Sequence, residues 1–125
     1  MQNALTLPIS QNLPFSPYAV PGMNRELIGN KTAMYILEMV SKSLNVSIPN
    51  ILGYSRKREK VIARHIAMYL IYERTSLGYK PVGKIFGRDH TTVMHACTGV
   101  RNDLTLKYET DIVTHLRNIE NQLKW

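Results

Sequence analysis

The sequence has one cysteine, Cys97, in 125 residues, and it has no apolar run near the roughly 18 residues that a membrane span needs. A single cysteine excludes an internal disulfide framework and is typical of a reducing compartment. The N-terminus also lacks the basic start of a signal peptide. We therefore expect a cytoplasmic protein that has no membrane partner.

Charged residues are absent from the first 23 positions, where prolines stand among glutamine, asparagine and serine. Proline at this density disfavours both helices and sheets. We interpret residues 1–23 as a flexible N-terminal arm and residues 24–125 as one folded domain, which is large enough to bury a core. The sequence also lacks a Gly-rich phosphate loop that ends in Lys-Ser or Lys-Thr, so we expect no nucleotide and no cofactor.

The net charge of +7 is concentrated in the centre of the chain. Residues 56–101 carry ten Lys or Arg against three Asp or Glu, whereas the rest of the chain carries six of each. A localised basic field attracts polyanions, and the phosphate backbone of a nucleic acid is the commonest one in a cytoplasm. The alternative is a solvated basic face that only aids solubility.

Apolar residues recur at helical spacing, which predicts an all-α, compact helical bundle. A first core helix is expected over residues 31–45, and a short helical turn over 47–53, with Pro49 in its first turn and Gly53 at its end. Residues 61–72 are apolar at nearly every position, which is typical of a central buried helix that ends near Thr75. A closing helix is expected over residues 108–125, with its apolar stripe formed by Ile112, Leu116, Ile119 and Leu123.

Residues 79–98 have the spacing of a helix-turn-helix. Gly87 can adopt the positive φ that the turn needs, Gly83 is a small residue where two helices touch, and Val93 locks the second helix. Asp89 can cap the second helix by accepting hydrogen bonds from its free amides. Glycine-turned helix pairs also occur as plain packing corners, which is the alternative interpretation.

The second helix is expected to have a buried and an exposed face. The buried stripe is Val93, Ala96, Cys97, Val100 and Leu104. The opposite face is His90, Thr91, Met94, His95, Thr98 and Arg101. Imidazoles, hydroxyls and methyl groups near the start of a helix suit the major groove of DNA, where they can contact base edges and thymine methyl groups.

This sequence resembles the C-terminal DNA-binding domain of DnaA, the bacterial replication initiator. The signature of that domain is a phenylalanine and glycines followed by Arg-Asp-His-Thr-Thr-Val and a His-Ala pair, and here it reads Phe86-Gly87-Arg88-Asp89-His90-Thr91-Thr92-Val93-Met94-His95-Ala96-Cys97. The likeness extends through Arg56-Lys57-Arg58, Ala63-Arg64 and residues 66–70, and it covers roughly residues 31–120. It implies a helical bundle with a helix-turn-helix similar to that of the Trp repressor.

The resemblance also implies roles for individual residues in binding double-stranded DNA. Arg56 would enter the minor groove, while Asp89, His90 and Thr91 would read bases in the major groove. The residues at or near the DNA backbone would be Arg58, Arg64, Thr92 and His95. The expected DNA-binding set is completed by Lys57, His65 and Arg88. The family reads an asymmetric TTATNCACA-type box as a monomer, so we expect a nucleoid-associated regulator of replication initiation or transcription.

Three departures from the family pattern are visible. One glycine is missing from the usual pair before Arg88, which shortens the turn and predicts a different tilt of the recognition helix. His65 stands where the family usually has glutamine. The nucleotide-binding motor of the initiator is absent, so we expect a stand-alone DnaA-related protein that does not melt an origin by itself.

The sequence also allows two other function classes. A protein-interaction module of the same fold would bind the replication initiator or another partner without reading DNA, through the N-terminal arm or the last helix. A metal-dependent enzyme is suggested by Asp89, His90, His95 and Cys97. However, His90 and His95 turn to different sides of a helix and Cys97 points to the core, whereas coordination needs converging ligands. We therefore expect neither catalysis nor a bound metal.

Overall fold

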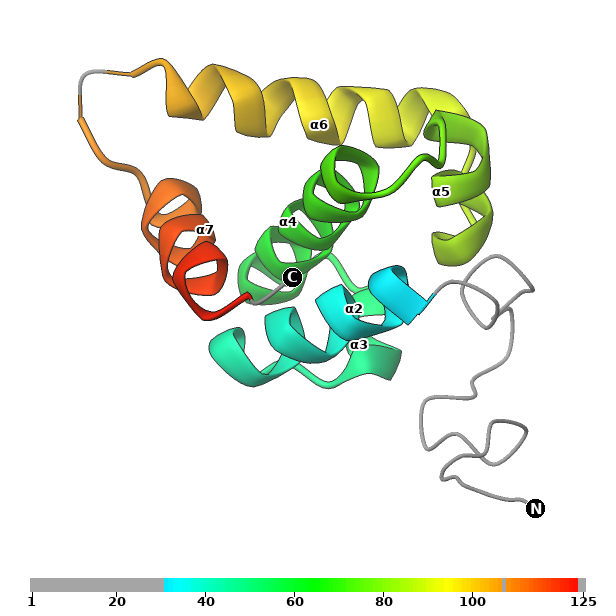
Figure 1. Ribbon diagram of the computed structural model, residues 1–125, viewed down its shortest axis with the longest axis horizontal. Helices are drawn as coiled ribbons and strands as arrows, with labels where there is room; N and C mark the ends of the chain where they lie inside the picture. The colour runs from blue at the N-terminus through cyan, green and yellow to red at the C-terminus, as the bar shows by residue number, and fades with distance from the viewer. Residues whose placement is uncertain (1–30, 107, 124–125) are drawn as a thin grey trace.

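The computed structural model describes residues 31–106 and 108–123, and within these ranges all regular structure is α-helical. The helices are α2 (Lys31–Leu44), α3 (Ile48–Leu52), α4 (Arg58–Arg74), α5 (Tyr79–Phe86), α6 (His90–Leu104) and α7 (Asp111–Gln122). Figure 1 shows α4 in the centre of the bundle, with α6 across one end, α5 and α7 on either side, and α2 and α3 at the other end. The all-α prediction is confirmed, while the predicted arm over residues 1–23 lies outside the described residues.

The central helix α4 is buried on most sides, as its apolar composition predicts. Its fully buried side chains come from more than one face: Ala63, Ile66, Ala67, Met68, Leu70 and Ile71. The helix begins at Arg58, directly after the connection over residues 53–57, which we call the basic loop. It ends at Arg74, and the next residue, Thr75, follows as the C-cap with its hydroxyl donating to the carbonyl oxygen of Ile71 at 2.6 Å. A helix packed on so many sides fixes its own N-terminus, and therefore the place where the basic loop meets the bundle.

The two helices before α4 follow local rules that the sequence already contains. On α2, the stripe of Ala33, Ile36, Leu37 and Val40 is fully buried against the core. Ser47 caps α3 by accepting a hydrogen bond from the backbone N of Asn50 at 3.3 Å, and Gly53 follows its last residue. The predicted short helix over residues 47–53 is thus confirmed.

Two details of the predicted helices were wrong. The closing helix begins at Asp111 rather than near residue 108, because Thr110 caps it by accepting from the backbone N of Val113. Leu104, predicted in the buried stripe of α6, is 38% exposed. It occupies the last turn of α6, which Figure 1 shows extending past α4 towards the connection to α7.

Candidate nucleic-acid interface

The turn between α5 and α6 has the backbone geometry of a helix-turn-helix. Gly87 adopts the left-handed region at φ 67° and ψ 33°, and the backbone N of Arg88 donates to the carbonyl oxygen of Gly83 at 2.8 Å. A side-chain carbon at Gly83 would overlap the carbonyl oxygen of Arg88, so the helices touch through a position without a side chain. The predicted helix-turn-helix is confirmed, and its turn closes with one left-handed residue, Gly87.

The start of α6 is organised by Asp89. Its Oδ1 accepts hydrogen bonds from the Thr91 hydroxyl at 2.7 Å, the Thr92 backbone N at 3.0 Å and the Thr92 hydroxyl at 3.1 Å. These bonds, led by the one from the Thr91 hydroxyl, lower the pKa of the Asp89 carboxyl. The predicted cap is confirmed. Because both threonine hydroxyls donate inward, their outward lone pairs present acceptors rather than donors to a ligand.

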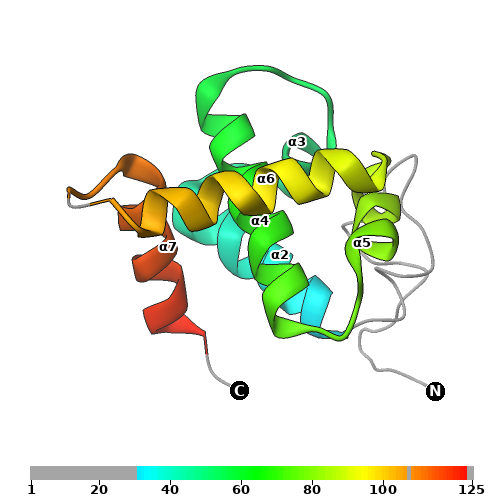
Figure 2. The same ribbon diagram turned by 90° about the horizontal axis from the view of Figure 1, so that it is seen from above.

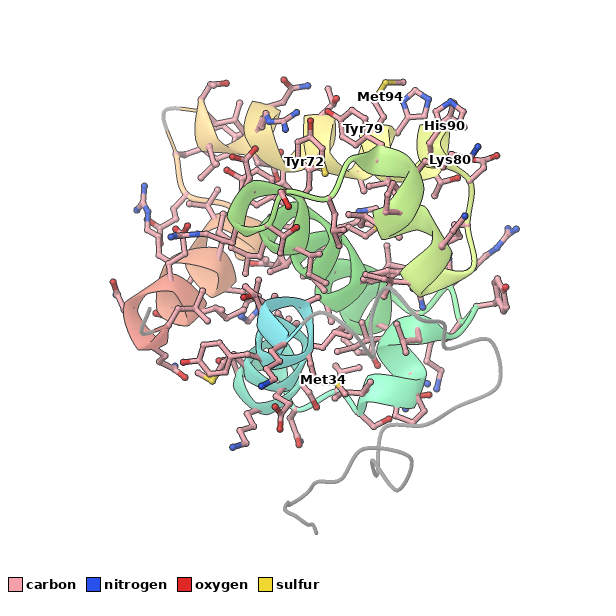
Figure 3. The ribbon with its side chains drawn as sticks, turned by 45° about the vertical axis from the view of Figure 1, so that its right-hand side comes forward. Met34, Tyr72, Tyr79, Lys80, His90 and Met94 are labelled. Carbon is pink, nitrogen blue, oxygen red and sulfur yellow. The ribbon has the colours of Figure 1, made fainter. Side chains whose placement is uncertain are left out.

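Most of the predicted DNA-binding residues are exposed on two segments. On α6 they are His90, Thr91, Thr92 and His95, and Figure 3 shows His90 projecting away from the bundle together with Met94. On the loop and the first turn of α4 they are Arg56, Lys57 and Arg58. Figure 2 shows the connection between α3 and α4 as an arch that projects beyond α6. The structure thus leaves two separate exposed segments of polar and basic side chains.

Arg64 has a use inside the protein that the sequence did not predict. It is only 6% exposed, and its guanidinium donates to the carbonyl oxygens of Ile51 at 2.8 Å, Ser55 at 3.1 Å and Asn50 at 3.2 Å. Burial, followed by the nearby charge of Arg88, lowers the pKa of Arg64. These donors satisfy carbonyl groups at the end of α3 and in the basic loop, which would otherwise lack partners within a helix.

Arg88 acts on the same segment from the other side. Its guanidinium donates to the carbonyl oxygens of Leu52 at 3.2 Å, Phe86 at 2.6 Å and Gly53. The guanidinium also lies over the ring of Tyr54, with its carbon 4.5 Å from the ring centroid. Arg64 and Arg88 together therefore attach the end of α3 and the basic loop to both α4 and the helix-turn-helix.

His65 is half-buried beside these two arginines. Burial, and then the charges of Arg64 and Arg88, lower the pKa of its imidazole. The side chain is therefore neutral near pH 7, because even an unperturbed histidine titrates near about 6.5. A neutral imidazole still offers one donor, but it does not add a positive charge to the interface.

The beginning of α5 is held by an aromatic cluster. The rings of Tyr72 and Tyr79 stack with centroids 4.2 Å apart and planes 7° apart. Arg101 donates to the Tyr79 hydroxyl at 3.5 Å and pairs with Glu73 at 2.9 Å, and these bonds raise the pKa of Arg101. Arg101 was predicted on the exposed face of α6, but it is half-buried because it joins α6 to α4 and α5.

The described residues gather no group of three or more His, Cys, Asp and Glu side chains that would hold a metal ion. Cys97 is buried, and burial raises the pKa of its thiol to about 11. The thiol is therefore protonated and unreactive near neutral pH. Within the part of the chain that the structure describes, no helix is both long and apolar enough to cross a membrane.

Tyr54 belongs to this region but was not among the residues predicted from the sequence. Its hydroxyl donates to the carbonyl oxygen of Gly87 at 3.3 Å, although 33 positions separate the two residues. The available signal was an aromatic residue next to a cluster of basic residues. It was not recognised, because nothing local to the loop indicates that Gly87 lies beside it.

Known proteins with similar sequences are bacterial replication initiators. The chromosomal replication initiator protein DnaA of Bifidobacterium animalis subsp. lactis is 39% identical over 90 residues, which cover 71% of this chain and 15% of that protein. DnaA of a Picosynechococcus strain is 44% identical over 71 residues, covering 56% of this chain and 16% of that protein. DnaA of Lactobacillus delbrueckii subsp. bulgaricus is 38% identical over 90 residues, covering 71% and 19% respectively. The chain thus matches less than a fifth of the length of each of these relatives.

The sequence also matches the family described as bacterial dnaA protein helix-turn-helix, over residues 33–100. This range includes the end of α3, the basic loop, α4 and the helix-turn-helix, which are the elements joined by Arg64 and Arg88. The family match supports DNA binding at the level of the family. On this evidence, the chain belongs to the family of bacterial DnaA helix-turn-helix domains.

Proposed function

We propose that the protein binds double-stranded DNA with sequence preference, at sites similar to the DnaA box, and thereby regulates replication initiation or transcription. The N-terminal turn of α6 enters the major groove, and Arg56 of the basic loop enters the adjacent minor groove. One observation carries this proposal. Arg88 lies directly before the exposed start of α6, and its guanidinium donates hydrogen bonds to the carbonyl oxygens of Leu52 and Gly53, where α3 passes into the exposed basic loop. Two DNA-facing segments joined in this way approach a duplex as one unit.

The chemistry of the two segments suits different parts of a duplex. Thr91 and Thr92 offer acceptor lone pairs and methyl groups, which match the amino groups of adenine or cytosine and the methyl group of thymine. Arg56 and Lys57 are exposed cations, which attract phosphates whatever the base sequence. We therefore assign discrimination to α6 and most of the affinity to the loop, in a module that performs no catalysis.

The assignment is tested by comparing His90→Ala with Lys57→Ala. His90→Ala is expected to reduce the preference for a duplex carrying a TTATNCACA-type box over a scrambled duplex, by about 1 to 3 kcal/mol. Lys57→Ala is expected to weaken both duplexes alike and to reduce the slope of log K against log salt by about 0.9. The measurement is a titration of both fluorescent duplexes at two salt concentrations.

Equal losses on both duplexes for both variants would contradict the division between α6 and the loop. A wild-type protein that binds neither duplex at moderate salt would contradict DNA binding itself. In that case the protein-interaction module becomes the better proposal, with the replication initiator as a candidate partner. The observation that favours it is the exposure of three large apolar side chains at the end of α6 and in the connection to α7: Leu104, Leu106 and Tyr108.

A further prediction concerns Arg58, which pairs with Asp111 across the first residues of α4 and α7. The two side chains are 3.1 Å apart, and they are 74% and 68% exposed. Such exposed pairs contribute only about 0 to 1 kcal/mol, so Arg58 can exchange Asp111 for a phosphate. Asp111→Asn is therefore expected to strengthen binding to any duplex a few-fold and to steepen the salt slope by up to about 0.9.

The matched control is Glu109→Gln, which removes the same charge two positions away. Glu109 pairs with Arg117 on α7 instead of with a residue next to the basic loop. It is expected to change the salt slope much less than Asp111→Asn. If both substitutions strengthen DNA binding equally, the effect comes from net charge and Arg58 has no specific part in it.

A further inference from the structure

Tyr54 is exposed without being free. Its side chain is among the most exposed large hydrophobic groups, at 74%, so it does not belong to the core. Yet its hydroxyl donates to the carbonyl oxygen of Gly87, the left-handed residue of the helix-turn-helix. The guanidinium of Arg88, the next residue of that turn, lies over the ring of Tyr54 in a cation–π contact. An exposed aromatic ring with two such partners needs an explanation other than packing.

The contacts of Tyr54 complete a network of hydrogen bonds between the basic loop and the turn of the helix-turn-helix. Arg88 donates to the carbonyl oxygens of Leu52 and Gly53, on one side of Tyr54, while Tyr54 itself binds Gly87. Residues 52–54 are thus attached to residues 87 and 88 by hydrogen bonds in both directions. Breaking one of these bonds leaves the others, but it loosens the geometry that they define together.

The loop is also held on its far side. The carbonyl oxygen of Ser55 accepts from Arg64, and the hydroxyl oxygen of Ser55 accepts from the backbone N of Lys57 at 3.3 Å. Arg56 therefore lies between residues whose positions are fixed from α4 and from the turn. The position of its backbone relative to the start of α6 depends on both sets of contacts.

We propose that Tyr54 is a positioning residue that sets the spacing between Arg56 and the N-terminus of α6. This inference rests on the proposed function, in which those two segments enter neighbouring grooves of one duplex. With Tyr54 present, the distance between the loop and the helix is fixed, so both segments fit their grooves at only one position along the base pairs, which is one register on the DNA. Without it, the loop cations still reach phosphates, but binding must first order the loop, so the preference for one register falls.

The test compares Tyr54→Ala and Tyr54→Phe with Tyr108→Ala. Tyr108 is a matched control because it is 70% exposed but lies in the connection between α6 and α7. Backbone amide exchange is measured without DNA, and each protein is titrated with a box duplex and a scrambled duplex at two salt concentrations. Thermal unfolding shows whether every variant is folded, which exposed substitutions are expected to preserve.

Tyr54→Ala is expected to speed amide exchange over residues 53–57 and to weaken the box duplex about tenfold, while weakening the scrambled duplex less than about twofold. Tyr54→Phe keeps the ring beneath Arg88 but loses the bond to Gly87, so its loss is expected to be intermediate. Tyr108→Ala is expected to match the wild type in both measurements.

Unchanged amide exchange in Tyr54→Ala overturns the inference, whatever happens to DNA binding. Equal weakening of both duplexes also overturns it, because Tyr54 would then contact the DNA backbone directly. If the wild type shows no preference for the box, the proposed function fails. The amide exchange still decides whether Tyr54 orders the loop.

Discussion

Replacing Gly83 with alanine is expected to destabilise the protein by about 3 kcal/mol, the upper part of the range for overpacked sites. The added carbon would overlap the carbonyl oxygen of Arg88 and would lie 3.3 Å from the backbone carbon and oxygen of Asp89. These are backbone atoms at the start of α6, so relief requires α6 to move relative to α5. The free energy of unfolding is measured by urea denaturation, and the expected loss is a large part of an ordinary domain's stability.

Gly99→Ala is the matched control, because it makes the same substitution within α6. Apart from its chain neighbours and the backbone of α6 itself, no heavy atom lies within 4 Å of a side-chain carbon at Gly99, and the residue is exposed. Alanine is the better helix former by up to about 1 kcal/mol, so this variant is expected to be stabilised. If Gly83→Ala is as harmless as Gly99→Ala, the contact between α5 and α6 is looser than the structure indicates.

The features that could be predicted from the sequence depend on neighbouring residues. Gly87 predicts a turn because the local backbone there requires a positive φ, which glycine adopts readily. Asp89 predicts a cap because the first amides of a helix need an acceptor from a neighbouring side chain. Ser47 and Gly53 bound α3 for the same kind of reason. Helical periodicity placed α2 and α4, since a stripe of apolar side chains has to meet a core.

The features that could not be predicted depend on which distant residues meet. A sequence shows that Arg64 and Arg88 are cations, but it does not show whether a carbonyl oxygen or a phosphate accepts their hydrogen bonds. The acceptors of Arg64 lie 9 to 14 positions away, and two of those of Arg88 lie 35 and 36 positions away. Leu104 was placed wrongly for a related reason. The periodicity of α6 does not show that its last turn extends past α4 and therefore has no core to pack against.

The second large effect is expected for Arg64→Lys. Lysine keeps the charge but replaces a planar fork with one compact ammonium, which does not reach three separated carbonyl oxygens. The carbonyl oxygens of Asn50, Ile51 and Ser55 then lose their hydrogen-bond donor. A buried acceptor without a partner lowers the stability of the fold by about 1 to 3 kcal/mol. Because the bond to Ile51 is buried and the others are partly buried, we expect a loss of about 3 kcal/mol in the free energy of unfolding, measured without DNA.

Arg56→Lys separates this internal role from DNA binding, because it makes the same change on the exposed loop. Arg56 is expected to tolerate it within about 0.5 kcal/mol of stability, as surface positions do. If Arg64 served the DNA backbone instead, Arg64→Lys would leave the free protein stable and would scarcely alter the salt slope, since a lysine also neutralises a phosphate. A destabilised Arg64→Lys beside a stable Arg56→Lys therefore means that the buried arginine holds the loop in place, whereas the exposed arginine has no structural role that a lysine does not fill.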